Sequence, residues 1–172
     1  MRGMRHVYLL RHAKSSGKQR GLSDHDRPLT RRGRGAATAI TRHLREQGIG
    51  PELVLCSTAR RARETLERIE PVLARRTAQE ESELYGASAG ALLERLRLVP
   101  DAVGSVLLIG HNPGLQQLAL VLAQPTPELR ELKAKYPTAA LAILAFDRPN
   151  WSELDQRTTE LLSFVRPRDL ED

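Results

Sequence analysis

Short continuous apolar runs alternate along the chain with segments in which apolar residues recur at helical spacing. The runs have the length and composition of strands that are buried on both faces of a sheet. They predict strands at 5–10, 52–56, 105–109, 139–146 and 161–165, with the last of these at an edge of the sheet.

Four intervening segments carry the helical pattern, and capping residues indicate where they begin and end. The first helix is expected to end at Gly48, and Pro71 is expected to end the second. The expected starts are Thr30, Ser57, Ser88 and the pair Asn112–Pro113, with the asparagine as cap and the proline in the first turn. Strands that alternate with helices predict an α/β fold, a three-layer α/β/α sandwich with a mostly parallel central sheet.

The chain of 172 residues is long enough to bury one sizeable core without disulfides or structural metals. It has no internal repeat, low-complexity tract or long linker that would mark a boundary. We therefore expect a single domain over residues 1–172. Because aromatic residues make up only 3% of the chain, Leu, Val, Ile and Ala must build its core.

The 27 basic and 21 acidic residues leave a net charge of +6, which suits anionic partners. The basic residues are not interleaved with aromatic ones, so we expect no nucleic-acid binding. A single cysteine, Cys56, excludes an internal disulfide and a multi-cysteine zinc site. Since no apolar run is long enough for a signal-peptide core or a membrane span, we expect a cytoplasmic monomer without membrane association.

Cationic side chains follow three of the predicted strands. Arg11 and His12 end the first, Arg61 lies where the second leads into a helix, and His111 follows the third. In parallel α/β sheets ligands bind at the carboxyl ends of the strands, so these four side chains are expected to meet in one pocket.

Two guanidinium groups and two imidazoles favour an anion with several oxygens, and phosphate is the obvious candidate. A neutral histidine among such donors can also attack phosphorus and form a phosphoenzyme. Nearby cations favour the neutral form of His12, and a backbone carbonyl that accepts from one ring nitrogen would determine which nitrogen attacks.

The stretches that carry this pattern resemble the histidine phosphatase superfamily, with its phosphoglycerate mutase-like fold, and most closely its short SixA-type phosphohistidine phosphatase branch. They are LLRHAKSS (9–16), DRPLTRRG (26–33), CSTARRARET (56–65), LLIGHNPGL (107–115), YPTAALAIL (136–144) and VRPRDL (165–170). The resemblance implies that His12 is the phosphorylated nucleophile, that Arg11 and Arg61 clamp the phosphate, and that His111 stabilises charge in the transition state. Arg61 fits the family motif better than Arg60, which is expected to be a solvated charge.

The resemblance is weakest for a general acid. Many members protonate the leaving group with a carboxylic acid, and in the comparable stretch ESELYGASAG (81–90) the nearest candidate is Glu83. The alternative is that Glu83 is an exposed acidic residue of a loop. Phosphohistidine has an imidazole leaving group that needs less help from an acid than an alkoxide does. A weak acid position therefore favours phosphohistidine as the substrate.

Smaller polar groups beside the expected pocket leave alternatives open. Ser15 and Ser16 could donate to a phosphate or form a plain polar turn, and the helix start at Asn112 adds backbone donors. Asp24, His25 and Asp26 form an incomplete ligand set beside Arg27, so a hydrogen-bonded turn is expected there, with no metal and no cofactor.

Three functions follow from these residues. The leading one is a metal-independent phosphatase that removes phosphate from histidine on a phosphorylated protein through a phospho-His12 intermediate. The alternatives are a small-molecule phosphomonoesterase of the same superfamily, acting on a small phosphorylated metabolite, and a noncatalytic module that binds a phosphorylated ligand.

Overall fold

The computed structural model describes residues 3–17, 20–73 and 77–171. A six-stranded sheet runs through its centre, in the order β3-β2-β4-β1-β5-β6. The strands are β1 (Arg5–Arg11), β2 (Leu53–Ser57), β3 (Thr77–Glu81), β4 (Ser105–Gly110), β5 (Leu141–Phe146) and β6 (Thr159–Val165). The first four in spatial order are parallel to one another, whereas β5 is antiparallel to both of its neighbours. The expected mostly parallel sheet is therefore correct except at β5.

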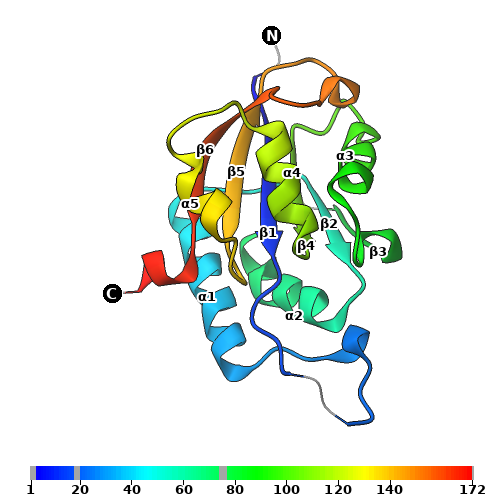
Figure 1. Cartoon of the computed structure of the whole chain (residues 1–172), viewed down its shortest axis with the longest axis vertical. Helices are drawn as coiled ribbons and strands as arrows, with labels where there is room; N and C mark the ends of the chain where they lie inside the picture. Colours follow the sequence, from blue (N-terminus) through cyan, green and yellow to red (C-terminus); the bar gives the residue numbers. More distant parts are fainter. Residues whose placement is uncertain (1–2, 18–19, 74–76, 172) are drawn as a thin grey trace.

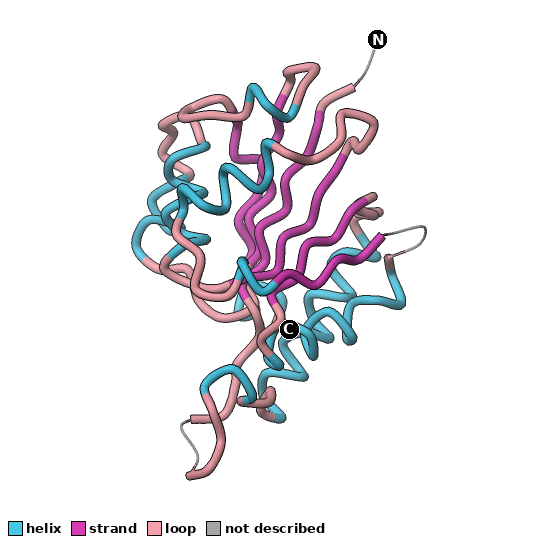
Figure 2. Tube along the Cα trace, turned by 90° about the vertical axis from the view of Figure 1, so that its right-hand side faces the viewer, coloured by secondary structure: helices cyan, strands magenta, loops and turns pink. Residues whose placement is uncertain are grey.

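Helices cover both faces of this sheet (Figures 1 and 2). They are α1 (Arg31–Glu46), α2 (Arg60–Ile69), α3 (Ala89–Arg97), α4 (Gly114–Leu122) and α5 (Leu129–Ala134). Short 3₁₀ turns are η1 (Asp24–Asp26), η2 (Glu70–Val72), η3 (Ser82–Leu84), η4 (Trp151–Glu153) and η5 (Pro167–Leu170). Among the described residues no helix has the length and apolar character needed to cross a membrane.

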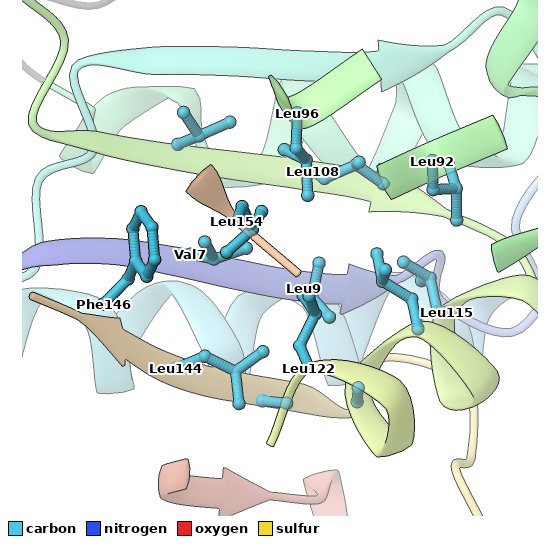
Figure 3. Close-up of a cluster of buried hydrophobic side chains, with 14 of the residues drawn as sticks. Val7, Leu9, Leu92, Leu96, Leu108, Leu115, Leu122, Leu144, Phe146 and Leu154 are labelled. Atoms are coloured by element: carbon cyan, nitrogen blue, oxygen red, sulfur yellow. The ribbon is translucent and has the colours of Figure 1, made fainter. Parts of the chain in front are cut away.

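Alternate residues of β1 point into two separate hydrophobic cores. Val7 and Leu9 pack with α3, α4 and α5 on one face (Figure 3), while Tyr8 and Leu10 pack with α1 and α2 on the other. Burying a leucine or valine side chain contributes roughly 1.5–3 kcal/mol, so a one-residue slip of β1 would be costly. This register places Arg11 beside Gly110 of β4 and thereby aligns the carboxyl ends of the two strands.

The five predicted strands and the first and third helix starts are confirmed. The Thr30 hydroxyl accepts from the Gly33 N–H at 2.9 Å, and Ser88 caps α3 in the same way, accepting from Ala91 at 3.1 Å. Gly48 follows α1 with a φ of 65°, as a glycine stop requires.

Two predicted helix starts are wrong, because both helices begin later in the chain. Ser57 is the last residue of β2, its hydroxyl contacts His111, and α2 begins only at Arg60. Helix α4 starts one residue later than expected, with Pro113 and not Asn112 at the N-cap position. Asn112 still contacts the first turn, since its Oδ1 accepts from the Gln116 N–H at 3.3 Å while its Nδ2 donates to Gln116 and to the Tyr136 carbonyl.

The strand β3 and the helix α5 were not predicted. The β3 sequence TAQEE has no apolar run, and this strand pairs only with β2 at the edge of the sheet. Helix α5 is six residues long and buries only Leu132. Both elements carry too little apolar signal for a periodicity argument.

Candidate active site

The carboxyl ends of β1, β2 and β4 bring together the four cationic side chains that the sequence singled out. The His12 and His111 rings have centroids 5.1 Å apart, and Arg61 Nε lies 3.3 Å from His12 Nε2. His12 and Arg61 are each 6% exposed and His111 is 8% exposed. Arg11, the last residue of β1, lies beside them and is partly buried. The sheet topology therefore assembles one cationic cluster from three distant parts of the chain.

His12 is held as a neutral imidazole with a defined tautomer. Its Nδ1–H donates to the Ala13 carbonyl at 2.8 Å, and its Nε2 accepts from Arg61. Burial lowers the pKa of His12 to about 3, and the charges of His111, Arg61 and Arg11 act in the same direction. At neutral pH Nε2 therefore carries a lone pair and no proton, and in this structure that lone pair faces the Arg61 Nε–H.

Thr65 couples the His12 loop to helix α2. Its hydroxyl accepts from the Ala13 N–H at 3.0 Å and donates to the Arg61 carbonyl at 2.7 Å. Thr65 is almost completely buried, so this hydroxyl is the partner that keeps a buried backbone donor satisfied. The same residue thus fixes both the peptide that orients His12 and the turn that carries Arg61.

Arg11 is fixed from the far side of the cluster by Tyr136. Its Nη1 donates to the Tyr136 carbonyl at 2.9 Å, and Asn112 Nδ2 donates to the same oxygen at 3.2 Å. The Tyr136 hydroxyl donates to the Leu9 carbonyl, which ties this segment to β1. Arg11 Nε is buried and has no partner among the described residues, so it is a donor that a bound oxyanion can take.

Arg61 and Arg60 have different surroundings. Arg61 donates to the Asp24 carbonyl at 2.8 Å and pairs with the Asp24 carboxylate at 3.2 Å, and its guanidinium lies over the Tyr85 ring. Arg60 is exposed and forms a helix-surface pair with Glu64. Only Arg61 of the two belongs to the cluster.

The Asp24 carboxylate is ionised. Its hydrogen bond from the Tyr85 hydroxyl is the main cause, and Arg61 and Arg27 add to it, so the pKa of Asp24 falls to about 2. An acid with this pKa has no proton to give to a leaving group at neutral pH.

Ser57 determines the tautomer of His111. The Ser57 hydroxyl lies 2.7 Å from His111 Nε2 and accepts from the Ala59 N–H. When the Ser57 hydroxyl donates to Nε2, the ring hydrogen of His111 lies on Nδ1. Burial and the nearby Arg61 lower the pKa of His111 to about 4. His111 Nδ1 is buried and has no partner among the described residues, which leaves it free to donate to a ligand.

The remaining sequence candidates are less closely tied to the cluster. The Ser16 N–H donates to the Pro28 carbonyl, and the Ser16 hydroxyl is buried without a partner among the described residues. Ser15 pairs with Leu29 in an isolated β-bridge. Asn112 is committed to Gln116 and Tyr136, as described above. Glu83 is exposed in η3, after the edge strand β3.

The stretch from Asp24 to Asp26 forms the hydrogen-bonded turn that was expected. Ser23 donates to Asp26, Arg27 donates to Asp24, and His25 contacts the Thr58 hydroxyl. No group of three or more potential metal ligands comes together in the described part of the chain.

Cys56 is fully buried, and burial raises the pKa of its thiol to about 12. The thiol therefore stays protonated and is a packing group.

Asp24, Tyr85, Ser57 and Tyr136 contact the cluster but were not among the residues singled out for it. Asp24 was weighed only as a metal ligand or turn residue, and Tyr136 lies within the quoted segment YPTAALAIL. The ring of Tyr85 lies edge-on to His111 with centroids 5.5 Å apart, yet β3, which leads to it, gave no strand signal. Their roles depend on three-dimensional contacts that spacing along the chain does not encode.

Comparisons with known proteins identify the family of the chain. The model of the histidine phosphatase superfamily (branch 1) matches residues 7–96. An uncharacterised protein of Mycobacterium tuberculosis is 36% identical over 163 residues, which cover 92% of this chain and 100% of that protein.

Solved structures extend the similarity to nearly the whole chain. A candidate phosphohistidine phosphatase SixA from Nakamurella multipartitia is 30% identical with a TM-score of 0.82, covering 96% of this chain and 98% of that one. The protein histidine phosphatase SixA complexed with tungstate is 26% identical with a TM-score of 0.79, covering 96% and 99%. The chain therefore belongs to the histidine phosphatase superfamily and to its SixA-type branch.

Proposed function

We propose that this phosphatase hydrolyses phosphohistidine on proteins, without a metal ion, through a phosphorylated His12. The observation that carries the proposal is the state of His12: a buried, neutral imidazole with Nδ1–H on a carbonyl and Nε2 directed at Arg61. In the first step Nε2 forms a bond to phosphorus while the phosphorus–nitrogen bond of the substrate breaks, and the substrate ring, protonated on its other nitrogen, leaves as neutral imidazole. Water then attacks the phosphoenzyme, and phosphate leaves as His12 becomes neutral again.

The cations supply the charge stabilisation that a metal would otherwise give. The charges of Arg11 and Arg61 both act on His12, and each guanidinium offers donors that suit phosphate oxygens. His111 Nδ1–H adds a neutral donor. A related protein, SixA, is described in complex with tungstate, a tetrahedral oxyanion, which supports an oxyanion site in this fold.

The surroundings of the site favour a phosphorus–nitrogen bond over an ester. The Asp24 carboxylate is ionised, and the Glu83 side chain is exposed in η3. An alkoxide leaving group requires a proton in the transition state, whereas an imidazole leaving group is far less demanding. The SixA relatives support the same substrate class.

The test compares initial hydrolysis rates for a phosphohistidine peptide and a panel of alkyl phosphomonoesters in the presence of a chelator, with His12→Ala as the control. We expect phosphohistidine to be preferred and the chelator to have no effect. Preference for an ester would establish the small-molecule phosphomonoesterase instead, and binding without turnover of either substrate would establish the noncatalytic module.

Glu83→Gln separates the two enzymatic alternatives further. The proposal requires phosphohistidine turnover to stay within about twofold of wild type, because the leaving group needs no acid. If this variant loses both phosphohistidine and ester turnover, Glu83 has a role in the reaction that the proposal does not contain.

A further inference from the structure

A large cationic groove adjoins the candidate active site and plays no part in the chemistry described above. Its volume is about 800 Å³. Its lining includes six cationic side chains, Lys14, Arg32, Arg130, Lys135, Arg166 and Arg168. Only two carboxylates, Glu131 and Glu171, share that lining. The wall elements are α1, α5 and η5, which all lie at the left of Figure 1, with α1 and α5 on opposite faces of the sheet.

Arg166 forms ion pairs in this lining, and the charge of Arg168 acts on the neighbouring Asp169. Arg166 pairs with Glu131 at 3.2 Å and with Asp169 at 2.9 Å. The other five side chains are exposed, and none of them forms an ion pair within the described residues. A concave surface with an uncompensated charge of this kind attracts an anionic partner.

The groove is joined to the backbone that carries His12. Lys14 is two residues from His12, so their Cα atoms are at most about 7 Å apart. The first turn of α1 lies directly on the Lys14 carbonyl, because a Cβ at Gly33 would come within 2.1 Å of that oxygen. On the other wall, Pro137 and Thr138 precede Ala139, whose N–H donates to the His12 carbonyl at 3.0 Å. The groove wall is therefore a neighbour of the His12 backbone, although none of Arg11, His12, Arg61 and His111 lines the groove itself.

We propose that this groove binds an acidic segment of the phosphorylated protein substrate, next to its phosphohistidine. The inference rests on the proposed function and adds the chemistry of the partner. The cations are separate, flexible and exposed, which suits the dispersed carboxylates of a protein surface better than the convergent, buried donors of a small-anion site.

Nucleic acid fits this groove less well. The lining residues include no aromatic side chain on which a base could stack, whereas charge complementarity with a protein segment requires none.

The test uses two synthetic peptides that each carry one phosphohistidine. One has glutamates on both sides of the phosphohistidine, and the other has glutamines at the same positions. For wild type we expect kcat/KM to be about tenfold higher for the acidic peptide at low ionic strength, mainly through KM, and the ratio to shrink toward one as salt is added.

Charge reversal in the groove should remove that preference. Arg32→Glu and Lys135→Glu alter two different walls, and each should lower the ratio by about threefold, while the double variant should bring it close to one. Arg148→Glu is the control for charge reversal away from the groove. Arg148 lies two residues after Phe146, and Phe146 pairs with Arg5 at the end of β1 opposite to His12. This control should keep the wild-type ratio. Turnover of free phosphohistidine in every variant reports whether the active site is intact.

Fluorescence anisotropy of the two peptides in their unphosphorylated form measures binding alone, and it separates the groove proposal from the proposed function. If wild type hydrolyses phosphohistidine but does not distinguish the peptides, the groove proposal is wrong while the function stands. A second outcome is that nothing is hydrolysed, that the acidic peptide binds better than the neutral one, and that charge reversal at Arg32 and Lys135 abolishes this difference. In that case the groove binds acidic segments and the proposed function is wrong. Tighter binding of a single-stranded DNA oligonucleotide than of the acidic peptide would overturn the groove proposal.

Discussion

Replacing Thr65 with valine tests whether the contact between α2 and the His12 loop positions the nucleophile. Valine has nearly the shape of threonine but cannot accept from the Ala13 N–H, which is fully buried. The Arg61 carbonyl loses a donor at the same time, but it lies in the first turn of α2 and keeps its helical partner. The change therefore leaves one backbone donor without a partner in the folded state.

The cost of that unsatisfied donor is about 1–3 kcal/mol. For a chain of this length each kcal/mol lowers the melting temperature by roughly 2–4 °C, so Thr65→Val should melt about 2–12 °C below wild type. The Ala13 carbonyl belongs to the segment that has lost its anchor, so the His12 ring should shift. We expect kcat/KM to fall by about tenfold to hundredfold.

Calorimetry and initial-rate kinetics on a phosphohistidine peptide measure the two effects. Thr65→Ser keeps the hydroxyl and should stay within about threefold of wild-type activity. Thr41→Val is the control, because the Thr41 hydroxyl donates to carbonyls in α1 and α2 and has no contact with the cluster. It should cost about 1 kcal/mol without changing kcat. Unchanged kcat/KM in Thr65→Val would refute the positioning role.

Three further predictions concern individual side chains. Arg61→Ala should lower both phosphate affinity and turnover rate, whereas Arg60→Ala should change both only slightly because Arg60 is an exposed charge. The reverse result in steady-state kinetics would assign the phosphate clamp to Arg60. Ser57→Ala should lower kcat more than it raises KM, because His111 loses the hydroxyl that contacts its Nε2. Equal effects on KM and kcat with a phosphohistidine peptide would contradict this prediction. Burial lowers the pKa of His12 to about 3 in the folded protein, whereas the ordinary value is 6.5, so the unfolded chain takes up a proton first as the pH falls. The free energy of unfolding should therefore fall below pH 6.5, by at most about 1.4 kcal/mol per pH unit for this residue. Urea unfolding of His12→Asn between pH 7 and pH 5 should show a smaller loss than wild type, and an identical slope would be evidence against the lowered pKa.

The fold could be predicted wherever burial leaves a strong apolar signal. Residues 7–10 and 106–109 are continuous apolar runs, and both lie in central strands. The strand β3 could not be predicted, because an edge strand with the sequence TAQEE is held by pairing to β2 and buries little of its own. The antiparallel direction of β5 depends on the path of the connection before it, and apolar periodicity carries no information on direction.

The cluster could be predicted because each member directly follows a buried strand or begins the helix after one. The groups that orient it could not, since Thr65, Tyr85 and Tyr136 reach it through contacts between elements that are far apart in sequence. Ser57 was taken for a helix cap, which is the commonest use of a serine before a helix. Its contact with His111 is visible only once β2 and β4 are placed side by side.

The most direct test of the account is to trap the phosphoenzyme. Wild-type protein is mixed with a ³²P-labelled phosphohistidine peptide, quenched in alkaline denaturant, digested and analysed by mass spectrometry, with His12→Ala treated in parallel. We predict an acid-labile, base-stable phosphate on His12 in wild type, and neither label nor turnover in His12→Ala. Label on another residue, or turnover by His12→Ala at a rate near wild type, would contradict the assignment of His12 as the nucleophile.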